Sequence, residues 1–377
     1  MRPKSPATLA FACSALVLTT ACGGGFSNTT STVDACVYVV NKSSSDISAF
    51  RLDTATGALS ALGSPISASG ADQMALHPSG KFAYATLPDA GGIQAFSINA
   101  TTGALTLQGS PVAAPAPTDL TLTPSGTFAY ASNQLSGTSG YRVSAYRVDA
   151  STGALTEISG SPFTISDVSE HIGGWPAGRM TVEPGGKYAY FPNLAQFNLS
   201  VYAIDAATGA LTATGSSAGT GSLPGATATD PSGKFIYVVN QGSASVSGYG
   251  IDSATGALTP LTGSPFAVGQ GPADLTVDPS GRYVYVTNQT DNTLSVLSLD
   301  GATGALSPLG SPVLTGLNPC SVRVDASGKF LYVANNGSQN VSAYSIDTAT
   351  GALTPLAGSP FPAGSAPTCV VTLKLKP

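Results

Sequence analysis

The sequence predicts an all-β chain made of seven similar units. The tetrapeptide Thr-Gly-Ala-Leu occurs seven times, with its glycine at positions 57, 103, 153, 209, 256, 304 and 351. A second motif, Pro-Ser-Gly-Lys-Phe-x-Tyr with variations, alternates with the first and begins at Pro78, Pro124, Pro184, Pro231, Pro279 and Ala326. Four short strands per unit, repeated in this way without any helical pattern, are typical of a ring of blades. We therefore predict a seven-bladed β-propeller of four-stranded antiparallel blades.

Each blade is expected to contain four strands, which we call A to D from the centre of the ring outward. Strand A is a short apolar run such as residues 273–277, and a Pro-Ser-Gly turn leads into strand B, which ends in Tyr-Val-Thr-Asn at 285–288. Strand C alternates polar and apolar residues, as in 293–299. This alternation with period two is the pattern of a half-buried strand.

The Thr-Gly-Ala-Leu copies are expected to form the turns between strands C and D. An Asp or Asn stands four residues before each glycine, as Asp347 does before Gly351. Such a side chain accepts hydrogen bonds from nearby backbone N–H groups, and glycine tolerates φ > 0. The most repeated motif is therefore predicted to be scaffold.

The two ends of the repeat array indicate how the ring closes. Residues 37–41 read as a strand B with no turn motif before it, and residues 367–375 read as a strand A with no strand B after it. We predict one composite blade, in which the C-terminal strand A joins the N-terminal strands B, C and D. Closure of this kind leaves no exposed edge between first and last blades.

Composition excludes several classes of function. The net charge is −5, only 9% of residues are charged, and no cluster of Lys and Arg occurs, which argues against nucleic acid as a partner. With two His residues and no clustered Cys or acids, a catalytic metal site is not expected. Gly-rich phosphate loops are also missing, so we predict no cofactor.

The N-terminal segment predicts export. Residues 1–21 contain a positive start, a short apolar run and small residues before Cys22, as in a signal peptide. The stretch at 18–25 resembles a bacterial lipoprotein signal, which implies a lipid on Cys22 and a membrane-anchored protein in the periplasm or on the cell surface. Cleavage after Ala21 without lipid is the alternative. Residues 22–35 then form a flexible tether, and residues 36–377 a single propeller domain.

Three cysteines lie in the predicted propeller: Cys36, Cys320 and Cys369. An odd number allows at most one internal disulfide. Whether Cys320 and Cys369 pair is left open by the sequence.

Tyr-Val-Thr-Asn at 285–288 and the Thr-Gly-Ala-Leu copies resemble the YVTN-type and lactonase-type seven-bladed β-propeller families. The lactonase type includes 6-phosphogluconolactonase-like proteins, so the resemblance implies a lactone-hydrolysing activity as one function. Residues 190–202 follow the lactonase-type pattern, except that Asn193 and Phe197 stand where that pattern has acids. An asparagine cannot act as a general base.

The units differ in length at two places, residues 135–141 in a B–C connection and residues 164–176 in a D–A connection. In a propeller these connections share one face, and the uniform A–B and C–D turns share the other. Loops that vary on a uniform scaffold usually carry binding functions. We therefore place the predicted ligand or partner at the variable face.

Candidates for a site come from the position five residues before each A–B turn, where the innermost strands should ring the channel mouth. It holds Gln73, Asp119, Arg179, Ala226, Asp274 and Ser321. We select Arg179, Asp119 and Asp274, with His171 and Trp175 above them in the longer connection. Structural roles are the alternative, because an Asp at a strand start often binds backbone, an Arg often makes an ion pair, and Trp175 would suffice to pin its loop.

Two hypotheses on function follow. The first is an exported propeller that binds a small molecule or a protein partner at its variable face. The second is a lactonase-like hydrolase, in which Arg179 polarises a lactone carbonyl and His171 activates water. Export would separate the protein from cytoplasmic phosphorylated sugars, and the acids of the lactonase-type pattern are missing at 193 and 197. These two points favour binding and leave open whether the protein is an enzyme.

Overall fold

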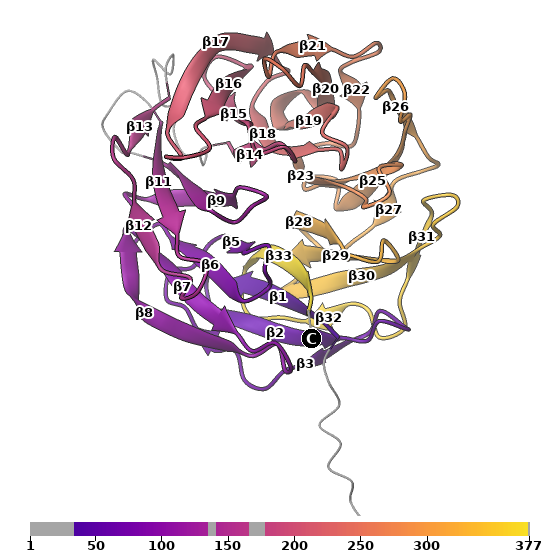
Figure 1. The fold of residues 1–377 in the computed structure, drawn as a ribbon. Helices are drawn as coiled ribbons and strands as arrows, with labels where there is room; N and C mark the ends of the chain where they lie inside the picture. The colour runs from indigo at the N-terminus through magenta and orange to yellow at the C-terminus, as the bar shows by residue number, and fades with distance from the viewer. Residues whose placement is uncertain (1–33, 135–140, 166–177, 376–377) are drawn as a thin grey trace, which may run out of the picture. The chain divides into compact units, whose positions relative to one another are not determined.

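The computed structural model describes residues 34–134, 141–165 and 178–375, and these form the predicted seven-bladed β-propeller (Figure 1). Seven antiparallel sheets follow one another along the chain. The innermost strand of each sheet contacts the innermost strands of the sheets on either side, so the seven inner strands surround the centre of the ring.

The strands occupy equivalent places in every blade. The A strands are β5 (Met74–Leu76), β9 (Pro117–Leu122), β14 (Thr181–Val182), β18 (Pro224–Thr229), β23 (Pro272–Val277), β28 (Pro319–Val324) and β33 (Pro367–Lys374). The B strands are β1 (Ala35–Asn41), β6 (Phe82–Leu87), β10 (Phe128–Asn133), β15 (Tyr188–Asn193), β19 (Phe235–Asn240), β24 (Tyr283–Asn288) and β29 (Phe330–Asn335).

The outer half of each blade follows the same scheme. The C strands are β2 (Asp46–Leu52), β7 (Gly92–Ile98), β11 (Arg142–Val148), β16 (Asn198–Ile204), β20 (Ser245–Ile251), β25 (Thr293–Leu299) and β30 (Asn340–Ile346). The D strands are β3 (Leu59–Ala61) with β4 (Ile66–Ser67), β8 (Leu105–Ala113), β12 (Leu155–Glu157) with β13 (Phe163–Thr164), β17 (Leu211–Gly219), β21 (Leu258–Pro260) with β22 (Phe266–Ala267), β26 (Leu306–Pro308) with β27 (Val313–Leu314), and β31 (Leu353–Pro355) with β32 (Phe361–Pro362).

Strand D differs from the expected single strand. In five blades it consists of two pieces that both pair with the same strand C. In the first blade the break contains Gly63, whose φ is +78°, and Pro65, which has no N–H to offer the ladder. These two residues therefore interrupt the outermost strand of this blade.

The ring closes as the sequence predicted. Strand β33, near the C-terminus, pairs antiparallel with β1, from Ala35 opposite Lys374 to Asn41 opposite Pro367 (Figure 1). Strands from the two ends of the chain thus complete one blade.

A buried tyrosine of each strand B joins neighbouring blades. Its hydroxyl donates a hydrogen bond of 2.7–3.2 Å to the carbonyl of the Thr-Gly-Ala-Leu glycine in the next blade. The tyrosines are Tyr38, Tyr84, Tyr130, Tyr190, Tyr237, Tyr285 and Tyr332, and each is at most 1% exposed. The bond from Tyr332 to Gly57 repeats this contact across the closing blade.

The C–D turns have the predicted chemistry. In the first blade, Asp53 Oδ1 accepts hydrogen bonds from the N–H groups of Ala55 (2.9 Å) and Thr56 (3.1 Å), and Gly57 has φ +77°. These two backbone hydrogen bonds lower the pKa of Asp53. The motif is scaffold, as expected.

The only helical element in the described part of the chain is a short 3-10 helix, η1 (Gln241–Ser243). No helix in residues 34–134, 141–165 and 178–375 has the length and apolar character needed to span a bilayer.

Candidate functional site

A cavity of about 420 Å³ opens where the seven inner strands begin. Every blade contributes one equivalent residue to its wall: Asp72, Thr118, Gly178, Gly225, Ala273, Cys320 and Thr368. Leu194, Gln241, Gln289 and Asn336, which follow the B strands, also line it. The B–C and D–A connections meet at this end of the strands, so the cavity lies opposite the Thr-Gly-Ala-Leu turns.

The sequence predicted that residues such as Asp274 and Ser321 line the mouth of the ring. In the structure, the residue one position earlier in each blade forms most of the cavity wall. Gln73, Arg179 and Ala226 belong to the lining, whereas Asp274 and Ser321 are 2% and 0% exposed. Successive side chains of a strand point in opposite directions. Ser321 therefore faces the next inner strand, where its Oγ accepts a hydrogen bond of 3.2 Å from the Val370 N–H.

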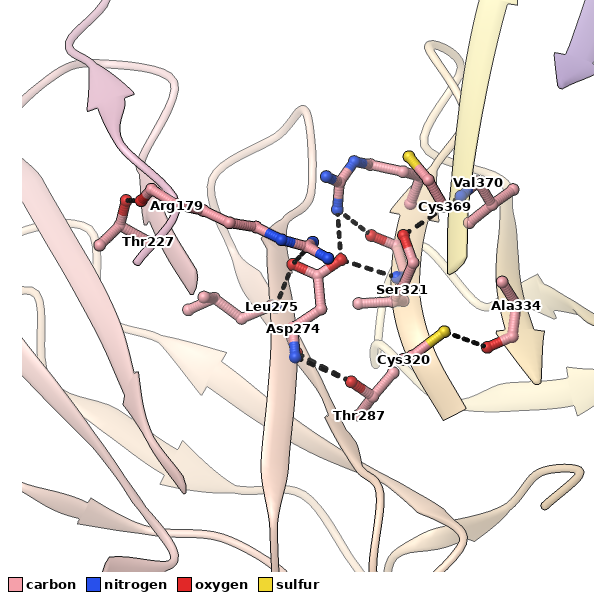
Figure 2. Close-up of polar contacts among 12 residues, drawn as sticks. Arg179, Thr227, Asp274, Leu275, Thr287, Cys320, Ser321, Ala334, Cys369 and Val370 are labelled. Carbon is pink, nitrogen blue, oxygen red and sulfur yellow. Dashed lines mark hydrogen bonds and ion pairs between the residues drawn. The ribbon is translucent and has the colours of Figure 1, made fainter. Parts of the chain in front are cut away.

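Asp274 lies between two arginines and two backbone amides (Figure 2). Its Oδ1 accepts a hydrogen bond of 3.0 Å from Leu275 N–H and lies 3.3 Å from Arg179 Nη1. Its Oδ2 accepts hydrogen bonds from Val322 N–H (3.0 Å) and Arg323 Nη1 (2.7 Å). The carboxylate is therefore fully occupied by the protein, and the structural alternative considered for it holds.

Arg323 is a member of this cluster that the sequence did not single out. Besides its bond to Asp274, its Nη1 donates to the Val322 carbonyl at 2.6 Å. The residue lies two positions after Ser321 on β28. Because side chains repeat every second residue along a strand, the period-two pattern would have placed Arg323 on the same side of the strand.

Arg179 is the cation that the protein leaves incompletely bound. It lines the cavity, and its buried Nη1 lies 3.3 Å from Asp274 Oδ1 as an ion pair but has no hydrogen-bond partner among the described residues. Burial alone would lower the pKa of Arg179, but the carboxylates of Asp274 and Asp119 outweigh it and raise the pKa. The guanidinium is therefore charged at every relevant pH.

Asp119 occupies the same repeat position as Asp274 in a different environment. It is half-buried, and the described residues place no ion-pair partner within 4 Å of its carboxyl group. Burial raises the pKa of Asp119, against the lowering effects of Arg179, the Leu120 N–H and Arg323, and Asp274 raises it further. Arg179 and Asp119 thus interact electrostatically without forming a salt bridge.

Cys320 and Cys369 are free thiols in the structure. The Cys320 Sγ, in the cavity wall, points to the Pro367 carbonyl at 3.2 Å, and the Cys369 Sγ points to the Met74 carbonyl at 3.7 Å. Burial raises the pKa of Cys320 to about 12, which the nearby Arg179 only partly offsets. A thiol that stays protonated is a poor nucleophile.

The remaining candidates fall elsewhere. His171, Trp175 and Cys22 lie outside the described residues, as do most of the two longer connections. Within residues 34–134, 141–165 and 178–375, no group of three or more His, Cys, Asp or Glu side chains is placed to hold a metal ion. Arg179, Asp119 and Asp274 are brought together electrostatically, but the ion pairs within 4 Å reach only Asp274.

Asn193, which stands where the lactonase-type pattern has an acid, has a structural role. Its side chain is fully buried, and its Nδ2 donates hydrogen bonds of 2.6 Å to Asn198 Oδ1 and Ser200 Oγ. The asparagine that ends strand B makes equivalent bonds in four other blades. Phe197 is 42% exposed in the following loop.

Solved structures with the same fold include three bacterial proteins. A candidate 6-phosphogluconolactonase from Bacteroides fragilis is 22% identical, with a TM-score of 0.75 over 90% of this chain and 98% of its own. A second candidate 6-phosphogluconolactonase, from Bacteroides uniformis, is 20% identical, with a TM-score of 0.76 over 90% and 100%. The periplasmic gluconolactonase of Pseudomonas aeruginosa is 20% identical, with a TM-score of 0.77 over 91% and 99%. At this level of identity the likeness shows the shared fold alone.

No curated protein matches the chain. The family model described as "Lactonase, 7-bladed beta-propeller" matches residues 37–168, 124–271 and 262–372, which together span nearly all seven blades. The chain therefore belongs to the lactonase family of seven-bladed β-propellers.

Proposed function

We propose that this propeller binds a small, oxygen-rich molecule in the cavity where the inner strands begin, and that Arg179 anchors it. The observation that carries the proposal is the side chain of Arg179, which lines the cavity, is 22% exposed, and is held, among the described residues, only through its ion pair of 3.3 Å with Asp274. A guanidinium beside a cavity favours an anionic or carbonyl oxygen there, because hydrogen bonds from a charged donor are roughly twice as strong as neutral ones. Arg179 is therefore the residue of the wall that we expect to anchor a ligand.

The rest of the lining suits a ligand with several oxygen atoms. Gln73, Gln241, Gln289 and Asn336 contribute carboxamides, which both donate and accept hydrogen bonds, and Thr118 contributes a hydroxyl group. A volume of about 420 Å³ is within the range of small-molecule sites. The cavity is thus polar on several sides and of a size for one metabolite-sized molecule.

This proposal is tested by differential scanning fluorimetry over a panel of sugar acids, sugar lactones and neutral sugars. At least one compound should raise the melting temperature of the wild type, because a ligand stabilises the state that it binds. Arg179→Gln should weaken that binding about 10- to 100-fold. If the best compound binds Arg179→Gln as tightly as the wild type, Arg179 is not the anchor.

A second candidate function, lactone hydrolysis, is favoured by membership of the lactonase family. In this scheme the guanidinium of Arg179 stabilises negative charge on a lactone carbonyl oxygen, and His171 activates the attacking water. A hydrolysis assay on the same lactones, with Arg179→Ala and His171→Ala as variants, separates the two functions. Hydrolysis lost in both variants would establish the enzyme, and binding without hydrolysis would support the first proposal.

We also propose that the protein is exported and held at a membrane by lipid on Cys22. The N-terminal sequence supports this, and a periplasmic location is known for one neighbour in structure, the Pseudomonas aeruginosa gluconolactonase. Cys22→Ala should move the protein from the membrane fraction to the soluble fraction. An unchanged distribution would contradict lipidation at this residue. A protein partner at the variable face stays a prediction from the sequence.

A further inference from the structure

Asp119 and Asp274 provide a comparison within one molecule. Both lie in the sequence Pro-x-Asp-Leu at the start of an inner strand, β9 for Asp119 and β23 for Asp274. Asp274 contacts the next inner strand through the Val322 N–H and Arg323. Asp119 has no such contact within the described residues. The aspartate at this repeat position therefore holds two inner strands together in one blade, whereas in the other blade it makes no such contact within the described part of the chain.

The charges of the cluster divide into two unequal pairs. Asp274 and Arg323 form a short ion pair of 2.7 Å, supported by two backbone amides on the same carboxylate. Arg179 reaches that carboxylate only at 3.3 Å. Once Asp274 is matched with Arg323, the remaining cation is Arg179, in the cavity wall, and the remaining acid is Asp119, without an ion pair.

Resting on the function proposed above, we propose that the ligand is a small monoanion, most simply a carboxylate, and that Asp119 takes up one proton when the anion binds Arg179. A carboxylate at Arg179 would bring a further negative charge close to Asp119 and Asp274. Protonation of Asp119 removes one of these negative charges and leaves Arg179 paired with the ligand. The step forms one O–H bond on the Asp119 carboxyl group, with the proton taken from solvent, and an ion pair with hydrogen bonds at Arg179; no other covalent bond forms or breaks.

Three charged groups act on Asp119 from the elements around it. Arg179, just before β14, and Arg323, on β28, favour its ionised form, whereas Asp274, on β23, favours its protonated form. Burial already raises the pKa of Asp119 above its ordinary value. An incoming anion adds to the effect of Asp274 and cancels that of Arg179, so both changes act in the direction of protonation.

The proposal predicts how affinity depends on pH. Between the pKa of Asp119 in the free protein and its higher pKa in the complex, uptake of one proton makes binding about tenfold tighter for each unit by which the pH falls. A neutral ligand of the same shape takes up no proton. Asp119→Asn resembles the protonated acid, so it should bind the anion tightly and with no pH dependence.

The test uses trifluoroacetate, which stays ionised over the range, and trifluoroacetamide as its neutral counterpart. Fluorine NMR measures the binding of each to the whole protein between about pH 5 and about pH 8. The wild type should bind trifluoroacetate in an Arg179-dependent manner that tightens as pH falls. Asp119→Asn should bind it tightly at all pH values, and trifluoroacetamide should bind more weakly, without pH dependence.

The outcomes separate this inference from the proposed function. Arg179-dependent binding of trifluoroacetamide but not of trifluoroacetate keeps the site and overturns the anionic ligand. Trifluoroacetate binding that is independent of pH in the wild type overturns the role of Asp119. If neither probe binds, the site itself fails, and the inference with it. Should Asp119→Asn not fold, calorimetry of trifluoroacetate binding in two buffers of different ionisation enthalpy measures proton uptake on the wild type directly.

Discussion

One face of the propeller is built from the same turn in each blade, whereas the opposite face differs from blade to blade. On the first face, the Thr-Gly-Ala-Leu glycine accepts a hydrogen bond from the buried tyrosine of the preceding blade around the whole ring. On the second face, the equivalent positions of the cavity wall hold an acid, two threonines, two glycines, an alanine and a cysteine. Repetition holds the ring together, and variation makes the candidate site.

Asp274 is an exception to this division between the two faces. It stands at a variable position beside the cavity, yet its contacts are those of a structural residue. A residue belongs to the scaffold or to the site according to what its side chain touches, and the repeat position alone does not decide.

The largest expected effect separates Asp274 from Asp119. Asp274→Ala removes a carboxylate from between Arg179 and Arg323, and breaking a buried pair typically costs about 3–5 kcal/mol of unfolding free energy. Asp119→Ala, at the same repeat position, should cost less than about 1 kcal/mol because it breaks no ion pair. Urea unfolding of both variants measures the difference. Equal losses would mean that the two aspartates have the same role.

The next effect tests the turn face. Gly256 has φ +72°, and a Cβ placed there would lie 2.4 Å from Cδ1 of Tyr188 in the preceding blade. Gly256→Ala should cost about 1 kcal/mol for the backbone and about 1–3 kcal/mol more for the clash.

Gly63→Ala is the matched control for Gly256→Ala. Gly63 has φ +78° and no atom within 4 Å of the added Cβ, so only the backbone cost of about 1 kcal/mol applies. Chemical denaturation gives both values, and neither variant should change ligand binding at the other face. If Gly256→Ala weakens ligand binding and Gly63→Ala does not, the turn face influences the site, and the separation of the two faces is wrong.

The smallest effect concerns the pH dependence of stability. Because the pKa of Asp119 is raised in the folded protein, the folded state keeps this proton to a higher pH than the unfolded chain does. The resulting stabilisation is fully present below the unfolded pKa of about 3.9 and is lost as pH rises through the folded pKa. Asp119→Asn should therefore melt higher than the wild type near pH 7 and match it near pH 4. A constant difference in melting temperature across the pH range would contradict a raised pKa.

Much of the architecture could be predicted from the sequence because it depends on local chemistry repeated seven times. Turn residues such as Asp347 and Gly351 define the blades, and the two incomplete units at the chain ends define the closure. The break in strand D at Gly63 was not anticipated, although Gly63 and Pro65 both disfavour a continuous strand.

The candidate site was harder to predict because it depends on contacts between blades. Arg179 was selected from its repeat position, but the sequence did not show that it shares Asp274 with Arg323, which lies about 140 residues away in the sequence. The cavity wall is offset by one residue from the expected ring, because which side of a strand faces the centre depends on the twist of the blade. His171 and Trp175 stay predictions.

The most direct test of the account is to find where an anion binds. Crystals soaked with 5-bromofuran-2-carboxylate, whose aryl bromine does not alkylate Cys320, allow the bromine to be located by anomalous scattering. The account predicts a bromine in the cavity, with the carboxylate against the guanidinium of Arg179, and none there in Arg179→Gln. An empty cavity in the wild type, with bromine only on the face of the Thr-Gly-Ala-Leu turns, would contradict it.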